Sequence, residues 1–318
     1  MLIGIEIGGT KLQVVLGDEK GNIYHLERGT VQKDWQSREI LDWVTETTKN
    51  QIQKAEQEGQ RVQSIGIGFG GPVDSVEGKV LISHQITGWQ GFPLRQWFED
   101  TFSIPTVLAN DANSAGWAEF VCGRGKGTRN FFYMNIGSGI GGALIIDGKL
   151  HDGQGLGAGE IGHTYVPDWT QEERGAYNKL ENICSGWSIE RRLQTENYVP
   201  QKSSLWAKTG GNLNLMTCVL LGKCAEEEDS FACEELDRIA QSVGIAISNV
   251  ITLFHPEKIA LGGGVSLMGD VLLNRIRAVV DRLVFTPFRN QYEISPCELG
   301  EQVVLVGALL LAGKLITP

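Results

Sequence analysis

The stretch Thr106-Val-Leu-Ala-Asn-Asp-Ala-Asn-Ser114 joins a predicted strand to a predicted helix. Its first four residues are typical of the end of a buried strand, and a helical pattern follows at 112–120. Asp111 lies at the junction between the two elements. Open α/β sheets usually place their reactive groups at the carboxyl ends of strands, just before a helix begins. We therefore predict that Asp111 is a catalytic base in an α/β protein.

Two glycine-rich turns, Gly8-Gly9-Thr10-Lys11 and Gly137-Ser-Gly-Ile-Gly-Gly142, lie on either side of this stretch in the chain. Each turn joins two short apolar runs, so each is predicted to form the tip of a β-hairpin. Glycines at a hairpin tip let several backbone N–H groups face a concavity, because no Cβ atoms intervene. Lys11 and the hydroxyls of Thr10 and Ser138 add further hydrogen-bond donors. The two tips are therefore predicted to hold a polyphosphate.

A third glycine run, Gly262-Gly-Gly264, stands between a predicted strand and a predicted helix and suits a nucleotide base or ribose. A dinucleotide-binding fold is the alternative, because Gly137-x-Gly139-x-x-Gly142 has its glycine spacing and Glu160 follows about 18 residues later. That fold requires a helix directly after the glycines, where the helix N-terminus binds the pyrophosphate. Residues 143–146 predict a strand instead, so this alternative is excluded.

The order of the predicted elements indicates two related lobes. Strands at 2–7, 12–16, 22–27 and 62–69, with a helix at 37–58, predict a mixed sheet, and a second strand–glycine–strand unit begins about 130 residues later. Further helices are predicted at 94–101, 185–195, 216–224, 231–254 and from about 268. We predict a small α/β lobe at 1–110, a large α/β lobe at 111–302, and an active-site cleft between them. An amphipathic helix at about 303–318 is predicted to pack back on the small lobe.

Composition narrows the class of protein. The chain has 318 residues, a net charge of −10 and a pI near 5.1, which argues against nucleic acid as a partner because phosphate contacts need a basic face. The longest apolar run, at 303–313, is too short to span a bilayer. The six cysteines show no metal-binding spacing, and no signal peptide is visible. We expect a cytoplasmic protein with reduced thiols and no membrane partner.

Several of these segments, taken together, resemble the ROK family of bacterial sugar kinases. They occur in the family's order and cover essentially the whole chain: Ile5-Glu-Ile-Gly-Gly-Thr-Lys11, Asn110-Asp111, Asn135-Ile-Gly-Ser-Gly-Ile-Gly141, Gly159-Glu-Ile-Gly-His163 and Leu261-Gly-Gly-Gly-Val-Ser266. The resemblance implies the two-lobed, actin-like (ribonuclease-H-like) ATPase fold that the family shares with hexokinase and the heat-shock chaperone ATPases. In that fold ATP lies between the lobes and a sugar hydroxyl is phosphorylated, so the expected activity is that of a glucokinase-like sugar kinase.

The resemblance also assigns roles by position. Asp111 becomes the base that takes the proton from the attacking sugar hydroxyl. The other expected sugar-binding groups are Asn110, Glu160, His163, Glu181 and the backbone of Gly70 and Gly71. Phosphates are expected at Gly8, Gly9, Thr10, Lys11, Gly137, Ser138 and Gly139, and adenosine at Gly262, Gly263 and Gly264.

Two departures from the family pattern concern metals. Glu6 stands where the family commonly has an Asp near Mg²⁺, so we expect Glu6 to hold Mg²⁺, through water. Many members carry a zinc motif, C-x-C-G-x-x-G-C-x-E. This chain has lost its three cysteines, whose positions hold Glu172, Arg174 and Lys179, and it keeps the terminal Glu181. A structural zinc needs its thiolates. We therefore expect no zinc, which leaves His163, a zinc ligand in those relatives, to act only on the sugar.

Other functions stay open at this stage. Some family members are repressors that bind a sugar without phosphorylating it, so a catalytically silent sugar sensor is one alternative, and an ATPase without a sugar substrate is another. Glucose is the first expected acceptor, with fructose, mannose, allose or N-acetylhexosamines as alternatives, because the altered segment at 165–182 lies near the sugar. Polyphosphate could replace ATP as the donor. By resemblance, the protein is expected to form a homodimer.

Overall fold

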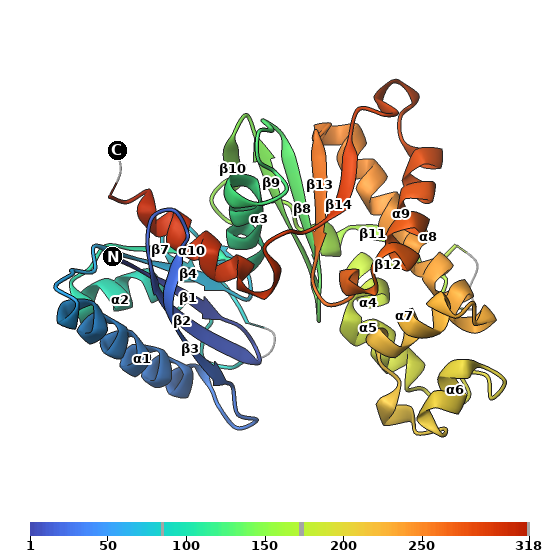
Figure 1. The fold of residues 1–318 in the computed structure, drawn as a ribbon, viewed down its shortest axis with the longest axis horizontal. Coiled ribbons are helices and arrows are strands. Elements are labelled where there is room, and N and C mark those ends of the chain that lie inside the picture. Colours follow the sequence, from blue (N-terminus) through green and yellow to red (C-terminus); the bar gives the residue numbers. More distant parts are fainter. Residues whose placement is uncertain (84–85, 172–174, 317–318) are drawn as a thin grey trace. The chain divides into compact units, whose positions relative to one another are not determined.

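A computed structural model describes residues 1–83, 86–171 and 175–316 (Figure 1). The chain divides into two compact units. The first unit comprises Met1–Gly127, Ala143–Ala158 and Glu298–Pro318, and the second comprises Thr128–Gly142 and Gly159–Cys297. No helix among the described residues is both long enough and apolar enough to cross a membrane.

The first five-stranded sheet has the order β3-β2-β1-β4-β7. Its strands are β1 (Leu2–Ile7), β2 (Lys11–Gly17), β3 (Ile23–Thr30), β4 (Ser64–Phe69) and β7 (Thr106–Asn110). Strands β1, β2 and β3 pair antiparallel in succession, whereas β1, β4 and β7 pair parallel. In the parallel register Ile7 lies opposite Phe69, and Phe69 lies opposite Asn110. The three parallel strands therefore end at one level of the sheet edge.

The second five-stranded sheet repeats this connectivity in the order β10-β9-β8-β13-β14. Its strands are β8 (Phe131–Ile136), β9 (Ile140–Ile146), β10 (Lys149–His151), β13 (Lys258–Gly262) and β14 (Glu293–Pro296). Strand β10 is antiparallel to β9, and β13 is parallel to both β8 and β14. The predicted internal repeat is thus confirmed, and β14 is a strand that the sequence pattern missed.

The remaining elements surround these sheets. The predicted helices appear as α1 (Ser37–Gln57), α2 (Leu94–Phe102), α3 (Asp111–Cys122), α5 (Gly186–Leu193), α7 (Cys218–Glu226), α8 (Ser230–Phe254) and α9 (Asp270–Leu283). Sequence patterns did not predict the short elements β5 (Val73–Asp74), β6 (Lys79–Val80), β11 (Tyr165–Pro167), β12 (Tyr177–Lys179), α4 (Leu180–Cys184) and α6 (Ser204–Thr209). Five single 3-10 turns are also present among the described residues, including η1 (Ile161–His163) and η3 (Ser266–Met268).

Helix α10 (Val303–Gly313) corrects one prediction. We predicted an amphipathic helix, but its residues are buried on nearly all sides, between the first sheet and α3. Two glycines allow this close packing: a Cβ atom on Gly66 would lie 1.9 Å from the Ala308 carbonyl oxygen, and one on Gly307 would lie 1.8 Å from that of Ser114. A helix enclosed by protein must be apolar all round.

Helix α3 belongs to the first compact unit, because it packs on α10. The predicted division at residue 110 therefore differs from the observed one, in which the first unit continues to Gly127. The buried Glu119 carboxylate accepts hydrogen bonds from the backbone N–H groups of Arg124 (3.0 Å), Glu298 (2.9 Å) and Leu299 (2.8 Å). Glu119 thus anchors the chain near two of the four places where it passes from one unit to the other, at 127–128 and 297–298.

Candidate active site

The first group of site residues lies directly after β1, β4 and β7, whose carboxyl ends are aligned in the sheet. Gly8, Gly70 and Asp111 are the next residues along each strand, so the register brings them together. A Cβ atom on Gly70 would lie 3.3 Å from Gly8 Cα and 3.6 Å from Asp111 Oδ2. The Asp111 carboxylate therefore lies beside bare glycine backbone, at the N-terminus of α3, where the helix dipole favours a negative charge.

Asn110 holds this arrangement in place. Its Oδ1 accepts hydrogen bonds from the N–H groups of Ala112 (2.8 Å) and Asn113 (3.2 Å), so Asn110 is the N-cap of α3. Its Nδ2 donates to the Gly71 carbonyl oxygen at 3.0 Å. We expected Asn110 to bind a sugar hydroxyl. In the structure its amide oxygen caps the helix and one of its two amide hydrogens binds the Gly71 carbonyl oxygen. The second amide hydrogen is therefore the group that suits a ligand.

The first hairpin carries charged and polar groups around Glu6. The turn is closed by a hydrogen bond from Gly8 N–H to the Lys11 carbonyl oxygen at 3.0 Å. Glu6 is buried; its Oε1 lies 3.2 Å from Lys11 Nζ, and its Oε2 accepts from Gln13 Nε2 at 2.6 Å. A carboxylate is a suitable ligand for Mg²⁺. Because both oxygens already have protein partners, Glu6 fits a cation held through water better than one bound directly.

The second hairpin lies beside the third glycine run. Gly137 N–H donates to the Gly139 carbonyl oxygen (2.9 Å), and Val265 N–H donates to the Ile136 carbonyl oxygen (2.9 Å). Gly263 has φ +85°, and a Cβ atom there would lie 2.5 Å from the Ile136 backbone. The ends of β8 and β13 therefore approach each other closely, and only glycine fits at position 263.

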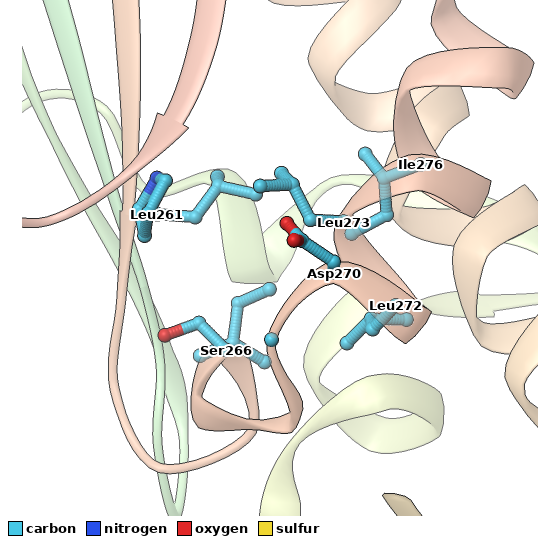
Figure 2. A pocket seen from close by; sticks show the side chains of 9 residues that line it. Leu261, Ser266, Asp270, Leu272, Leu273 and Ile276 are labelled. Carbon is cyan, nitrogen blue, oxygen red and sulfur yellow. The ribbon is translucent and has the colours of Figure 1, made fainter. Parts of the chain in front are cut away.

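A small cavity of about 40 Å³ lies next to this junction, between the ends of the strands and α9 (Figure 2). Figure 2 shows Leu261 on the side of the strand, Leu273 and Ile276 on the side of the helix, and the Asp270 carboxylate between them. The complete lining is Ile136, Leu261, Ser266, Gly269, Asp270, Leu272, Leu273, Ile276 and Pro296. Such a mainly apolar lining suits the flat face of a heterocyclic base rather than a phosphate.

Glu160, His163 and Glu181 form a second polar group. Glu160 directly precedes η1, which contains His163, and Glu181 lies in the first turn of α4. Although Glu160 reaches solvent, partial burial raises its pKa; a positive charge on His163 would oppose this rise, and the Glu181 carboxylate adds to it. Glu181 Oε2 also accepts from Ile140 N–H at 2.7 Å, and a Cβ atom on Gly139 would lie only 2.6 Å from that oxygen. The three side chains therefore act on one another beside the second hairpin.

Lys179 is a site residue that the sequence analysis missed. Its Nζ lies 3.1 Å from His163 Nδ1, so His163 is not left to the sugar alone as we expected. The paired strands β11 and β12 place Lys179 opposite Tyr165, two residues beyond His163. In the sequence alone, Lys179 indicates only the loss of a thiolate, because its contact with His163 depends on the pairing of β11 with β12.

The hairpin of β11 and β12 is anchored by Trp169, which follows β11. Trp169 Nε1 donates to Ser242 Oγ at 3.0 Å, and the guanidinium groups of Arg192 and Arg238 lie 4.6 Å and 5.7 Å from the centre of its ring. Residues 172–174, which include two of the former cysteine positions, lie outside the described residues. Among the residues that are described, no group of three or more His, Cys, Asp or Glu side chains could hold a metal ion.

A family model described as "ROK family" matches residues 2–314. The chain belongs to the ROK family. It is 31% identical to a glucokinase of Streptomyces coelicolor, over 98% of this chain and 97% of that protein. It is 25% identical to a xylose repressor of Caldicellulosiruptor bescii, over 98% of this chain and 77% of that protein.

A solved structure confirms the predicted fold class. This ROK chain superposes on a ROK family glucokinase from Streptomyces griseus, solved in complex with glucose and AMPPNP, with a TM-score of 0.81. The two are 28% identical, and the match covers 98% of this chain and 99% of the other. The fold is therefore that of the ROK sugar kinases, the actin-like ATPase fold. In this ROK chain the predicted base belongs to the first unit, and Glu160, His163 and Glu181 belong to the second.

Proposed function

We propose that this ROK sugar kinase transfers the γ-phosphoryl group of ATP to a hydroxyl of a hexose, with Asp111 as the general base. The observation that carries the proposal is the position of Asp111. It lies at the aligned carboxyl ends of β1, β4 and β7, beside Gly8 and Gly70. Asp111 takes the proton from the sugar hydroxyl, the hydroxyl oxygen attacks the γ-phosphorus, and ADP leaves. This reaction asks the protein mainly for positioning and charge neutralisation.

The sugar is proposed to bind Glu160, His163, Glu181, Asn110 and the backbone of Gly70 and Gly71. The two carboxylates accept hydrogen bonds from hydroxyl groups, and the amide hydrogen of Asn110 donates one. Glucose is our first choice of sugar, because glucokinases are among the relatives that match nearly the full chain. Fructose, mannose and N-acetylhexosamines are the alternatives to test.

ATP is proposed to bind the glycine segments. The N–H groups and donor side chains at 8–11 and 137–139 suit its phosphates, and the run at 262–264, with the apolar cavity beside it, suits adenosine. A bound Mg²⁺ would neutralise part of the phosphate charge. Glu6 is the residue that would hold it, through water, because Gln13 and Lys11 already contact both carboxylate oxygens.

We also propose that the protein needs no zinc. The support is the ammonium of Lys179 beside His163, in a place where a zinc-binding relative has a thiolate. A positive ammonium does not bind a metal cation. Elemental analysis of the purified protein tests this, and stoichiometric zinc would contradict it.

The deciding experiment is ADP release from Mg-ATP in the presence of a panel of hexoses and acetylated hexosamines, with Asp111→Asn as the control. One sugar should raise turnover well above the sugar-free rate in the natural protein but not in the variant. Replacing ATP with polyphosphate in the same assay tests the second possible donor. Equal ADP release with and without every sugar would contradict a sugar kinase.

A sugar sensor without kinase activity is the second candidate, because the xylose repressor also matches nearly all of this chain. The same panel separates the two functions. A sensor would bind one sugar in calorimetry and turn over no phosphoryl donor. We further propose a cytoplasmic homodimer, on the family resemblance, which light scattering at several protein concentrations would test.

A further inference from the structure

The contact between Lys179 and His163 has a defined direction. The Lys179 Nζ and His163 Nδ1 atoms lie 3.1 Å apart, within hydrogen-bond distance. An ammonium group has three donor hydrogens and no acceptor. Nδ1 must therefore be the acceptor, and the proton of the neutral imidazole must lie on Nε2.

The backbone that carries Lys179 is held on several sides. Leu180 N–H donates to the Thr164 carbonyl oxygen at 2.9 Å, which joins the segment directly to the one that carries His163. Asn178 Oδ1 accepts from Lys179 N–H and from Asn182 Nδ2, each at 2.9 Å. Asn178 Nδ2 donates in turn to Asp168 Oδ2 at 3.0 Å. The backbone of Lys179 is thus held in place. This reduces the conformational entropy that is lost when the lysine side chain contacts His163.

We propose that Lys179 is a positioning residue that keeps His163 as an Nε2–H donor to the sugar. The inference rests on the proposed function, because it takes the group of Glu160, His163 and Glu181 as the sugar site. Two of these three side chains are carboxylates that accept hydrogen bonds, so His163 is the member able to donate one. A sugar hydroxyl can donate to a carboxylate and accept from a neighbouring N–H at the same time.

Losing this fixed donor has a specific cost. If the imidazole proton moved to Nδ1, Nε2 would present a lone pair in place of its N–H group. A sugar oxygen there would lose its donor and face only acceptors, and unpaired polar groups at a binding site reduce affinity. Lys179 should therefore act on sugar binding and leave ATP binding unchanged.

Three substitutions at position 179 give a graded test. Lys179→Arg keeps a group that only donates, Lys179→Met removes the donor while keeping much of the stem, and Lys179→Glu places an acceptor against Nδ1. We expect the sugar KM to stay within about twofold for Arg, to rise about tenfold for Met and to rise further for Glu, since a tenfold change corresponds to one good hydrogen bond. The KM for ATP should change less than twofold in all three. Equal sugar KM values in all four proteins would overturn the proposal.

A second measurement reports on the imidazole itself. The ¹⁵N resonances of the His163 ring, assigned by their loss in His163→Gln, distinguish a protonated from an unprotonated nitrogen. The natural protein and Lys179→Arg should show Nδ1 unprotonated, Lys179→Met should show a mixture, and Lys179→Glu should show Nδ1 protonated. An unchanged Nδ1 signal in Lys179→Glu would refute the positioning role. Because this readout needs no turnover, failure of the kinase assay would leave it intact and would count against the proposed function alone.

Discussion

The two five-stranded sheets share one connectivity but carry different chemistry. In the first sheet the hairpin tip has an ion pair between Lys11 and Glu6, and the last parallel strand, β7, ends directly before Asp111. In the second sheet the corresponding tip is uncharged and donates Ile140 N–H to Glu181, and the last parallel strand, β14, ends before Cys297. The two sheets therefore share one backbone arrangement, and they differ in that only the first has a carboxylate, that of the proposed base Asp111, directly after its last parallel strand.

The largest expected effect comes from removing that base. Asp111→Asn should lower kcat by about 10²- to 10⁴-fold, the usual contribution of a general base, while sugar binding in calorimetry persists. Cys297→Ser, the change at the corresponding position of the second repeat, is the matched control and should keep near-natural turnover. An Asp111→Asn enzyme with a tenth of natural activity would show that the base assignment is wrong.

The close approach of β8 and β13 gives the next effect. Gly263→Ala forces a Cβ atom to 2.5 Å from the Ile136 backbone at φ +85°. The free energy of unfolding should fall by about 1–3 kcal/mol in a urea titration, and the KM for ATP should rise. Gly264→Ala, where a Cβ atom would meet nothing within 4 Å, should change stability by less than about 0.5 kcal/mol. Equal losses in the two variants would rule out this explanation.

The difference between the two hairpin tips can be measured directly. Lys11→Met should raise the KM for ATP about tenfold, because a charge-assisted hydrogen bond to phosphate is about twice as strong as a neutral one. Ser138→Ala, at the uncharged tip, should raise it about twofold. If Ser138→Ala had the larger effect on the KM for ATP, the second hairpin tip, and not the first, would be the main phosphate site.

The smallest expected effect is a pH shift at the second hairpin. The pKa of Glu160 is raised by burial, and the Glu181 carboxylate adds to the rise. If sugar binding needs ionised Glu160, kcat/KM falls as pH drops through this raised pKa. Glu181→Gln keeps an oxygen for Ile140 N–H but removes the negative charge that helps to raise the Glu160 pKa. The acid limb of the kcat/KM profile should therefore move to lower pH. Glu234→Gln, on the exposed face of α8, should leave the limb in place, and a shift to higher pH in Glu181→Gln would contradict the coupling.

Much of the fold and of the site follows from local sequence patterns. The strand before Asp111, the helix after it, the glycine hairpins and the long helices α1 and α8 were all predicted close to their observed bounds. These elements depend on neighbours within a few residues, through side-chain periodicity and the freedom of glycine. The roles of Asp111, Glu160 and Glu181 in catalysis and sugar binding stay predictions that the proposed assays test.

Other features depend on partners far away in the chain. The sequence determined the strand ends, the glycine tips and the acidic residue between β7 and α3, because each is specified by a short run of residues. Only the tertiary structure decided that Asn110 caps α3 while holding Gly71, that α10 is buried against Gly66, and that Lys179 meets His163. Such contacts form when packing brings distant segments together, and a periodic pattern contains no information about which partner a side chain will find.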